Sequence, residues 1–231
     1  SRLPSLQEKS PISVFSSWLA HNFNFQAYQA VRASGWLQKL IDEAGEGWKG
    51  PIIISYGIAQ PVLPAAIFEP SRPIWMVINT LRGLGWYALA PFLVYALFAA
   101  FRASPAERKA QMIWLSLATW TWILIASANA GGDLWDNPRY RAILLAFQAL
   151  LAAWAWGWAT AHRDPWLRRW LAIEAVFVLF FLQWYASRKT RLFSRLHFWE
   201  MIAAILILSA LILLGGWIRD RKKKAENKVK G

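Results

Sequence analysis

The most regular feature of the sequence is a series of long apolar stretches separated by short polar ones. A helix that crosses a bilayer needs about 20 mainly apolar residues. We expect such helices at Gly83–Phe101, Gln111–Ala128, Ala142–Ala161, Trp170–Ala186 and Phe198–Ile218. Aromatic residues, which favour the boundary between lipid and water, mark several of the edges, among them Trp86, Trp170 and Trp217. The pattern therefore predicts an all-α fold, a polytopic membrane helix bundle with about five transmembrane helices.

The residues before the first predicted span have a different pattern. From Ser13 to Ala44, apolar residues at helical spacing alternate with Gln, Asn, Lys and Asp, which is typical of a helix on a membrane surface. Pro51–Phe68 is apolar enough to enter the membrane, but Pro61 and Pro64 would interrupt a helix there. A helix broken by Pro leaves backbone polar groups unpaired, and at membrane depth these groups need contact with protein or water. We therefore expect this segment to be interfacial or re-entrant.

The distribution of Lys and Arg indicates the orientation, because basic residues in short loops are retained on the cytoplasmic side. The loops after the first and third spans and the C-terminal tail share one side and carry thirteen bases: Arg102, Arg108, Lys109, Arg163, Arg168, Arg169, Arg219, Arg221, Lys222, Lys223, Lys224, Lys228 and Lys230. The other side carries six: Arg139, Arg141, Arg188, Lys189, Arg191 and Arg195. We expect a multi-pass protein of the inner cell membrane with a cytoplasmic C-terminus. The predicted parts are an extracytoplasmic interfacial segment (1–73), a five-helix transmembrane domain (74–218) and a basic cytoplasmic tail (219–231).

The composition supports a membrane protein and excludes several kinds of functional site. Hydrophobic residues make up 57% of the 231 residues, 17% are charged, and 17 are Trp. The net charge of +13 resembles that of nucleic-acid-binding proteins, but the bases lie mostly between apolar stretches, so we expect membrane lipids and no nucleic acid as partners. The absence of Cys excludes disulfides and thiolate chemistry, and the three His residues are scattered. We expect no protein-bound metal and no cofactor.

The loop between the second and third predicted spans, 130–141, is the densest group of ionisable residues beside the lipid. Arg offers a planar fork of donors that matches phosphate oxygens, and acidic neighbours could orient that fork or contact sugar hydroxyls. The candidate lipid-phosphate-binding residues here are Asp133, Asp136, Arg139, Tyr140 and Arg141. An ordinary turn, in which two Gly residues end one helix and the Arg side chains extend toward water, is an equally weighted alternative.

This loop also carries a resemblance to a known family. The sequence Asn-Pro-Arg-Tyr-Arg at 137–141, preceded by Asp136 and followed by a long apolar helix, resembles the C-terminal half of polytopic GT-C-type glycosyltransferases. These are similar to protein O-mannosyltransferases and lipid A aminoarabinose transferases, which use polyprenyl-phosphate-linked sugars. The resemblance implies that Arg139, Tyr140 and Arg141 face a lipid phosphate at the outer leaflet. In that family the catalytic base is an Asp in a first outer loop and further spans precede this region; neither is present here.

A second basic loop, 187–197, lies on the side that is expected to be poor in bases. Its candidate residues are Arg188, Lys189, Arg191 and Arg195. They would complete the phosphate site from the same face, or bind lipid headgroups individually, where each base contributes only about 1 kcal/mol. Glu174 and Glu200 lie one turn inside the fourth and fifth predicted spans. For both we favour a structural ion pair over a functional role. The expected partner of Glu200 is His197 or Arg195. Arg82 precedes the first span and is expected to extend toward water.

Taken together, these features favour a membrane glycosyltransferase module that binds the lipid-phosphate half of a polyprenyl-phosphate-linked sugar donor. The chain begins with Ser and its first ten residues lack the layout of a signal peptide, so we expect it to be processed or part of a longer enzyme. We expect it to bind the donor without transferring sugar by itself. The alternative is a non-catalytic integral membrane subunit that anchors other membrane subunits or anionic lipids. A small transporter is disfavoured because no span has a mid-membrane ionisable residue.

Overall fold

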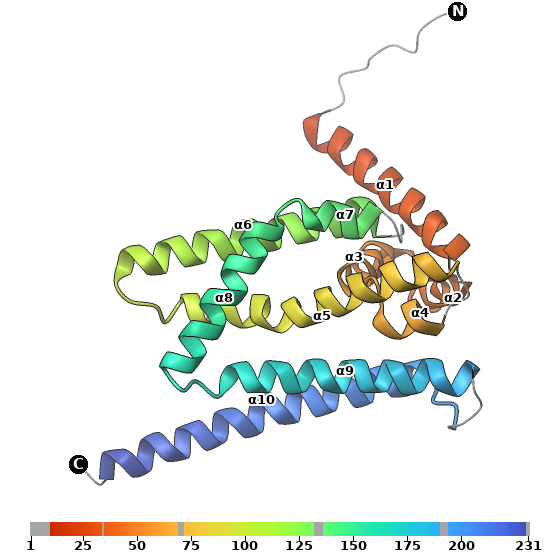
Figure 1. The fold of residues 1–231 in the computed structure, drawn as a ribbon. Helices are drawn as coiled ribbons and strands as arrows, with labels where there is room; N and C mark the ends of the chain where they lie inside the picture. The colour runs from red at the N-terminus through yellow and green to blue at the C-terminus, as the bar shows by residue number, and fades with distance from the viewer. Residues whose placement is uncertain (1–9, 34, 69–71, 132–135, 190–193, 230–231) are drawn as a thin grey trace, which may run out of the picture. The chain divides into compact units, whose positions relative to one another are not determined.

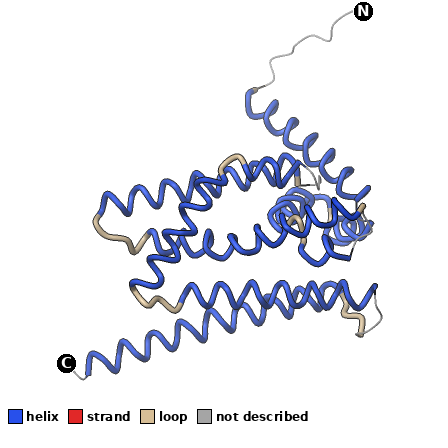
Figure 2. Tube along the Cα trace, in the orientation of Figure 1, coloured by secondary structure: helices blue, strands red, loops and turns tan. Residues whose placement is uncertain are grey.

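The computed structural model describes residues 10–33, 35–68, 72–131, 136–189 and 194–229. In these residues all regular structure is helical (Figure 2), which confirms the all-α prediction. The helices are α1 (Pro11–Ala33), α2 (Gly35–Ala44), the 3₁₀ helix η1 (Glu46–Trp48), α3 (Lys49–Ala59), α4 (Leu63–Phe68), α5 (Pro73–Ala100), α6 (Ala106–Ala130), α7 (Asp136–Ala142), α8 (Leu145–Ala161), α9 (Trp166–Lys189) and α10 (Phe198–Val229).

Four of the described helices are long and apolar enough to cross a membrane, so the chain is a multi-pass membrane protein. They are α5, α6, the Trp166–Arg188 part of α9 and the Phe198–Lys222 part of α10. The predicted third span, Ala142–Ala161, differs because the helix is interrupted at Leu144, whose φ of −101° and ψ of 29° are not helical. The remaining helix α8 has 17 residues, or about 26 Å, somewhat less than the roughly 30 Å hydrocarbon core.

The Pro-containing stretch that precedes the long helices is broken as expected. α3 ends at Ala59, and Gln60, in an extended conformation, leads to the separate short helix α4. The predicted surface segment Ser13–Ala44 forms α1 and α2. Gly45 follows α2 with a φ of 90°, a left-handed conformation that favours glycine.

The helices pack into two compact units, each made of two separate parts of the sequence. Unit 1 comprises Ser1–Gln60 and Trp120–Ile143, and unit 2 comprises Pro61–Thr119 and Leu144–Gly231. These two units are defined by which helices pack together. The predicted parts 1–73, 74–218 and 219–231 are defined by their expected position relative to the membrane. The two divisions therefore describe different properties of the chain.

Unit 1 has its own small apolar core. Ala27 of α1, Ile41 of α2 and Ile53 of α3 are buried together, and their neighbours are Phe23, Leu40, Ile52 and Tyr56. These residues come from the parts of the sequence with helical apolar spacing, which explains why α1 to α3 pack against one another.

Two glycines allow α3 to approach the end of α6 in unit 1. A Cβ atom on Gly57 of α3 would lie 2.9 Å from Gly131 Cα and 2.9 Å from Ser127 Cβ. A Cβ atom on Gly131 would lie 2.6 Å from the carbonyl oxygen of Ile53. Small residues let helix backbones approach closely in membrane proteins, and here no larger residue fits at either position.

In unit 2, α5 packs against α4, α8 and α9, and α9 packs against α10 (Figure 1). The ring centroids of Tyr87 and Phe177 are 6.1 Å apart, and those of Phe98 and Trp170 are 5.5 Å apart. Because residue numbers rise along α5 as they fall along α9, the two helices are antiparallel. The start of α5 therefore lies at the same end of unit 2 as the end of α9.

The α8–α9 loop is held to α5 by one buried carboxylate. Asp164 Oδ2 accepts a hydrogen bond from the Tyr95 hydroxyl at 2.8 Å and pairs with Arg102 Nη1 at 2.8 Å. Its Oδ1 accepts the backbone N–H of Trp166 at 3.0 Å, which caps the start of α9. The fully buried Tyr95 thus connects the interior of α5 to this loop.

Near the same end of α9, a bidentate ion pair joins this helix to α10. Arg169 Nη1 and Nη2 lie 2.7 and 2.8 Å from the two oxygens of Asp220. Gly216 on α10 leaves room for the Arg169 side chain, whose guanidinium also lies 4.4 Å from the centroid of the Trp166 ring. Bidentate geometry of this kind fixes the relative rotation of the two helices as well as stabilising their contact.

Candidate functional site

The short helix α7 is attached to the end of α3 by two side chains on one face. Asn137 Nδ2 donates to the carbonyl oxygen of Gly57 at 2.7 Å and to Gln60 Oε1 at 3.3 Å. Arg141 Nη1 donates to the carbonyl oxygen of Ile58 at 2.9 Å, and Nη2 donates to that of Gln60. Both side chains are buried.

This attachment has a simple physical cause. The last carbonyl groups of a helix have no partner within the helix and carry partial negative charge, so a cation and an amide donor are favourable there. Asn137 and Arg141 are four residues apart, which places them on the same face of α7. One face of α7 is thus occupied by the carbonyl groups of α3.

The other face of α7 is exposed and carries the centre of the predicted phosphate site. Arg139 and Tyr140 are both exposed. Trp122 Nε1 donates to the carbonyl oxygen of Tyr140 at 2.8 Å, so α7 is also connected to α6 within unit 1. The predicted residues therefore separate into exposed Arg139 and Tyr140 and buried Arg141.

A second capping pair, which the sequence did not indicate, comes from α1. Asn22 Nδ2 donates to the carbonyl oxygen of Ala128 at 2.9 Å, and Gln26 Nε2 donates to that of Asn129. Both carbonyl groups belong to the last turn of α6. The available signal is an amide pair at i and i+4 in a segment where apolar and polar residues alternate, the same spacing as that of Asn137 and Arg141.

The side chains of the two acidic members of the first predicted cluster lie outside the described part of the chain. Asp133 lies outside the described residues, and Asp136 begins α7 but its side chain is not described. In the second cluster Arg191 is outside the described residues and Lys189 is described only as the last residue of α9. Their predicted roles stay predictions.

The described part of the second basic loop is arranged around Trp184. The Arg188 guanidinium lies 3.7 Å from the centroid of the Trp184 ring and donates to the carbonyl oxygens of Trp184 at 3.1 Å and Leu196 at 3.4 Å. Gln183 Nε2 donates to the carbonyl oxygen of Ser194 at 2.9 Å. Arg195 is exposed. The contacts of Arg188 and Gln183 connect the end of α9 to the residues that precede α10.

The two glutamates of the predicted spans differ in their partners. Glu200 Oε2 accepts the backbone N–H of His197 at 3.3 Å, so it caps the start of α10 and does not bond the imidazole. Glu174 Oε1 is buried and accepts no hydrogen bond within the described part of the chain. The structural pairing expected for Glu174 is therefore not found for that oxygen atom.

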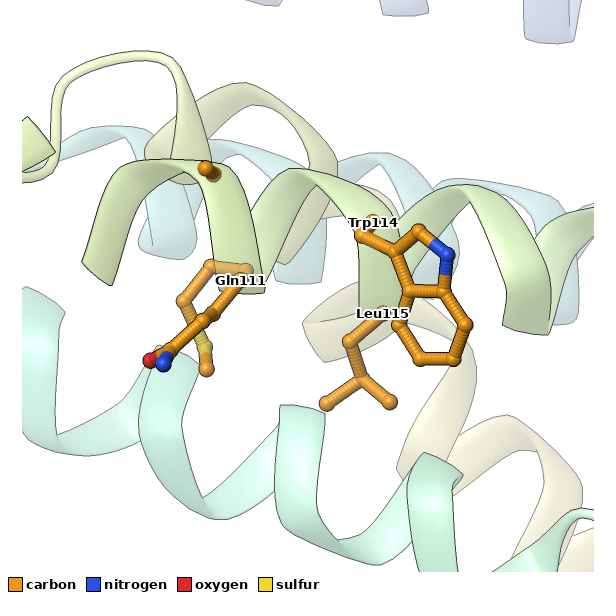
Figure 3. A pocket seen from close by; sticks show the side chains of 5 residues that line it. Gln111, Trp114 and Leu115 are labelled. Carbon is orange, nitrogen blue, oxygen red and sulfur yellow. The ribbon is translucent and has the colours of Figure 1, made fainter. Parts of the chain in front are cut away.

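The two basic clusters belong to different units, Arg139 and Arg141 to unit 1 and Arg188 and Arg195 to unit 2. Their union in one anion site stays a prediction. A hollow of about 540 Å³ lies elsewhere, along the first turns of α6, and is lined by Ala110, Gln111, Met112, Trp114 and Leu115. Figure 3 shows Gln111 and Leu115 on the same side of α6. The hollow is open and contains no predicted site residue.

The described part of the chain contains no group of three His, Asp or Glu side chains that could hold a metal ion. No family model, curated protein or solved structure compared with the chain matches it. Functional assignment therefore depends on the chemistry of α7, of the second basic loop and of their surroundings.

Proposed function

We propose that the chain is the lipid-phosphate-binding half of a membrane glycosyltransferase that uses a polyprenyl-phosphate-linked sugar. The observation that carries this proposal is the division of α7 into two faces. Asn137 and Arg141 hold one face against carbonyl groups of α3, and Arg139 and Tyr140 are presented on the exposed face. A short helix fixed in this way orients a guanidinium and a phenol for a ligand.

In this proposal Arg139 and Tyr140 contact the phosphate, and Arg141 is a positioning residue. The guanidinium fork of Arg139 matches two phosphate oxygens, and the Tyr140 hydroxyl donates to a third. When the sugar is transferred, negative charge develops on the departing lipid phosphate, and donors that are already oriented stabilise it. Transfer also needs a base that takes the acceptor proton, and the family resemblance assigns that role to an Asp outside the region that is matched here.

The experiment compares two exposed arginines in the purified chain by measuring its affinity for a polyprenyl phosphate. Arg139→Ala should weaken binding about tenfold or more, since a hydrogen bond to a charged group contributes about 1.5–3 kcal/mol. Arg108→Ala removes an equal charge from the start of α6 and is the matched control, which should bind as the unmodified chain does. Equal losses from the two substitutions would mean that only bulk charge matters, and the proposal would be wrong.

The non-catalytic membrane subunit makes a different prediction for the same proteins. A subunit that only anchors anionic lipids binds phosphatidylglycerol as well as polyprenyl phosphate, because each Lys or Arg near the surface contributes similarly for either lipid. A lipid-phosphate site for sugar transfer should prefer the polyprenyl phosphate, and that preference should decrease in Arg139→Ala. Equal affinity for both lipids would favour the subunit.

A further inference from the structure

Arg82 of α5 is half-buried and has one guanidinium nitrogen without an acceptor. Its Nη1 atom is fully buried and makes no hydrogen bond within the described part of the chain. The sequence suggested that Arg82 precedes the first span, but α5 begins at Pro73, so Arg82 lies about 14 Å along this helix. An unpaired guanidinium nitrogen inside an apolar membrane helix is unfavourable, and such groups are usually functional.

The antiparallel packing of α5 and α9 places Arg82 and Gln183 toward the same end of unit 2. From the Tyr87–Phe177 contact, Arg82 lies about 8 Å toward the start of α5, and Gln183 lies about 9 Å toward the end of α9. Because the helices are antiparallel, both steps lead to the same end of unit 2 (Figure 1). α4 packs against both helices.

Gln183 adds a second unsatisfied group at this end. Its Nε2 is used by the carbonyl oxygen of Ser194, but its Oε1 is buried and accepts no hydrogen bond from the described residues. The Arg82 nitrogen needs a hydrogen-bond acceptor, and the Gln183 oxygen needs a hydrogen-bond donor. A headgroup that combines phosphate oxygens with a hydroxyl supplies both.

The charge at this end also favours an anion. Arg188 and Arg195 are close enough for their positive charges to repel each other. On α10 the nearby Glu200 accepts the backbone N–H of His197, and on α9 Glu174 is nine residues from Gln183. A phosphate would relieve the repulsion between the arginines and satisfy the buried Arg82 nitrogen.

We propose that Arg82, with Gln183, Arg188 and Arg195, binds the phosphate headgroup of a lipid at this end of unit 2. Arg82 donates to a phosphate oxygen through Nη1, Gln183 Oε1 accepts a headgroup hydroxyl, and the two outer arginines attract the anion. This inference rests on the proposed function only for the class of ligand, a lipid phosphate. It assigns to that ligand a residue of α5 that lies outside both basic loops.

The test uses the full chain in zwitterionic nanodiscs and measures both its thermal stability and its affinity for a polyprenyl phosphate. Arg82→Met replaces the guanidinium group, with its unsatisfied Nη1, by an apolar side chain of similar length. The ligand-free melting temperature should therefore stay the same or rise, while the affinity of this site falls at least tenfold and the ligand raises the melting temperature less than it does in the unmodified chain. Arg82→Lys keeps the charge without the fork and should bind with intermediate affinity. Arg168→Met, at an exposed position of α9, is the control and should bind normally.

A purely structural Arg82 gives the opposite pattern, a lower ligand-free melting temperature in Arg82→Met with affinity unchanged, and that result would overturn the inference. Equal stabilisation of the chain by inorganic phosphate alone would overturn the assignment to a lipid. Loss of binding in Arg139→Ala together with normal binding in Arg82→Met would also overturn it while leaving the proposed function intact. Loss in Arg82→Met with normal binding in Arg139→Ala would support the Arg82 site and contradict the role given to α7.

Discussion

Asn137 and Arg141 lie one turn apart on α7, and both donate hydrogen bonds to carbonyl groups at the end of α3. The two helices are about 80 residues apart in the sequence, and Arg141 and Ile58 are separated by 83 positions. This relationship fixes the rotation of α7 and so decides which of its residues face outward. It also separates the arginines of one short motif into a structural one and an exposed one.

The first prediction concerns this attachment. Arg141→Ala should lower the free energy of unfolding of the chain in detergent by about 1.5–3 kcal/mol for each charged hydrogen bond that is lost. Arg108→Ala, at an exposed position of α6, is the control, and its effect should stay within about 0.5 kcal/mol. Denaturant or thermal unfolding followed by circular dichroism measures both. Similar stabilities of the two variants would show that Arg141 does not anchor α7.

The second prediction concerns the close approach of α3 and the end of α6. Gly57→Ala places a methyl group 2.9 Å from the backbone of Gly131, and relief requires the helix backbones to shift. Overpacking of this kind typically costs about 1–3 kcal/mol. Gly85→Ala on α5 is the matched control, because nothing lies within 4 Å of the added Cβ, and it should be neutral or stabilising. A neutral Gly57→Ala variant would mean that the helices are less closely packed.

The third prediction concerns the Asp164 network. Asp164→Ala leaves the buried Tyr95 hydroxyl without its acceptor, so we expect a loss of about 1.5–3 kcal/mol, to which the half-exposed Arg102 adds little. Tyr95→Phe should cost about 1.5–3 kcal/mol. The double variant should cost less than the sum of the single variants, because the two side chains share one hydrogen bond. Strict additivity in unfolding experiments would contradict the network.

The fourth prediction decides whether α8 crosses the membrane. Three helical segments, α6, α7 with α8, and α9, separate Ser104 from Ser194, and both serines are exposed. If all three cross, cysteines introduced at Ser104 and Ser194 react with an impermeant reagent from opposite sides, with Ser104 cytoplasmic. The chain has no native Cys, so labelling is specific. Reaction of both cysteines from the same side would mean that α8 does not span. Ser127, which is buried, is unsuitable for this measurement.

The long helices could be predicted from the sequence because apolar length alone defines them. Phe198–Ile218, for example, begins at the first residue of α10. The predicted first span starts at Gly83, ten residues after α5 begins, because Arg82 is typical of the edge of the lipid. A helix nevertheless continues through a single Arg as long as its backbone hydrogen bonds are satisfied. Hydropathy could not show the break at Leu144 because the residues on both sides are apolar.

The candidate site could be predicted only in part. Arg139 and Tyr140 were identified from their chemistry, and their exposure is compatible with the predicted role. The burial of Arg141 could not be predicted, because its acceptors lie in the distant segment that ends α3 and because nothing local distinguishes it from Arg139. Arg82 is expected from the sequence to extend toward water, and the burial of its Nη1 atom could not be predicted because it depends on tertiary packing.

The division of unit 1 between two separate parts of the sequence has a consequence for synthesis of the chain. Ser1–Gln60 leaves the ribosome before Trp120–Ile143 has been made, and at about 5–20 residues per second the interval is roughly 3–12 s. During that time α3 has neither Asn137 nor Arg141 to satisfy its last carbonyl groups. The nascent N-terminal helices must therefore remain without these partners until the later segment has been made.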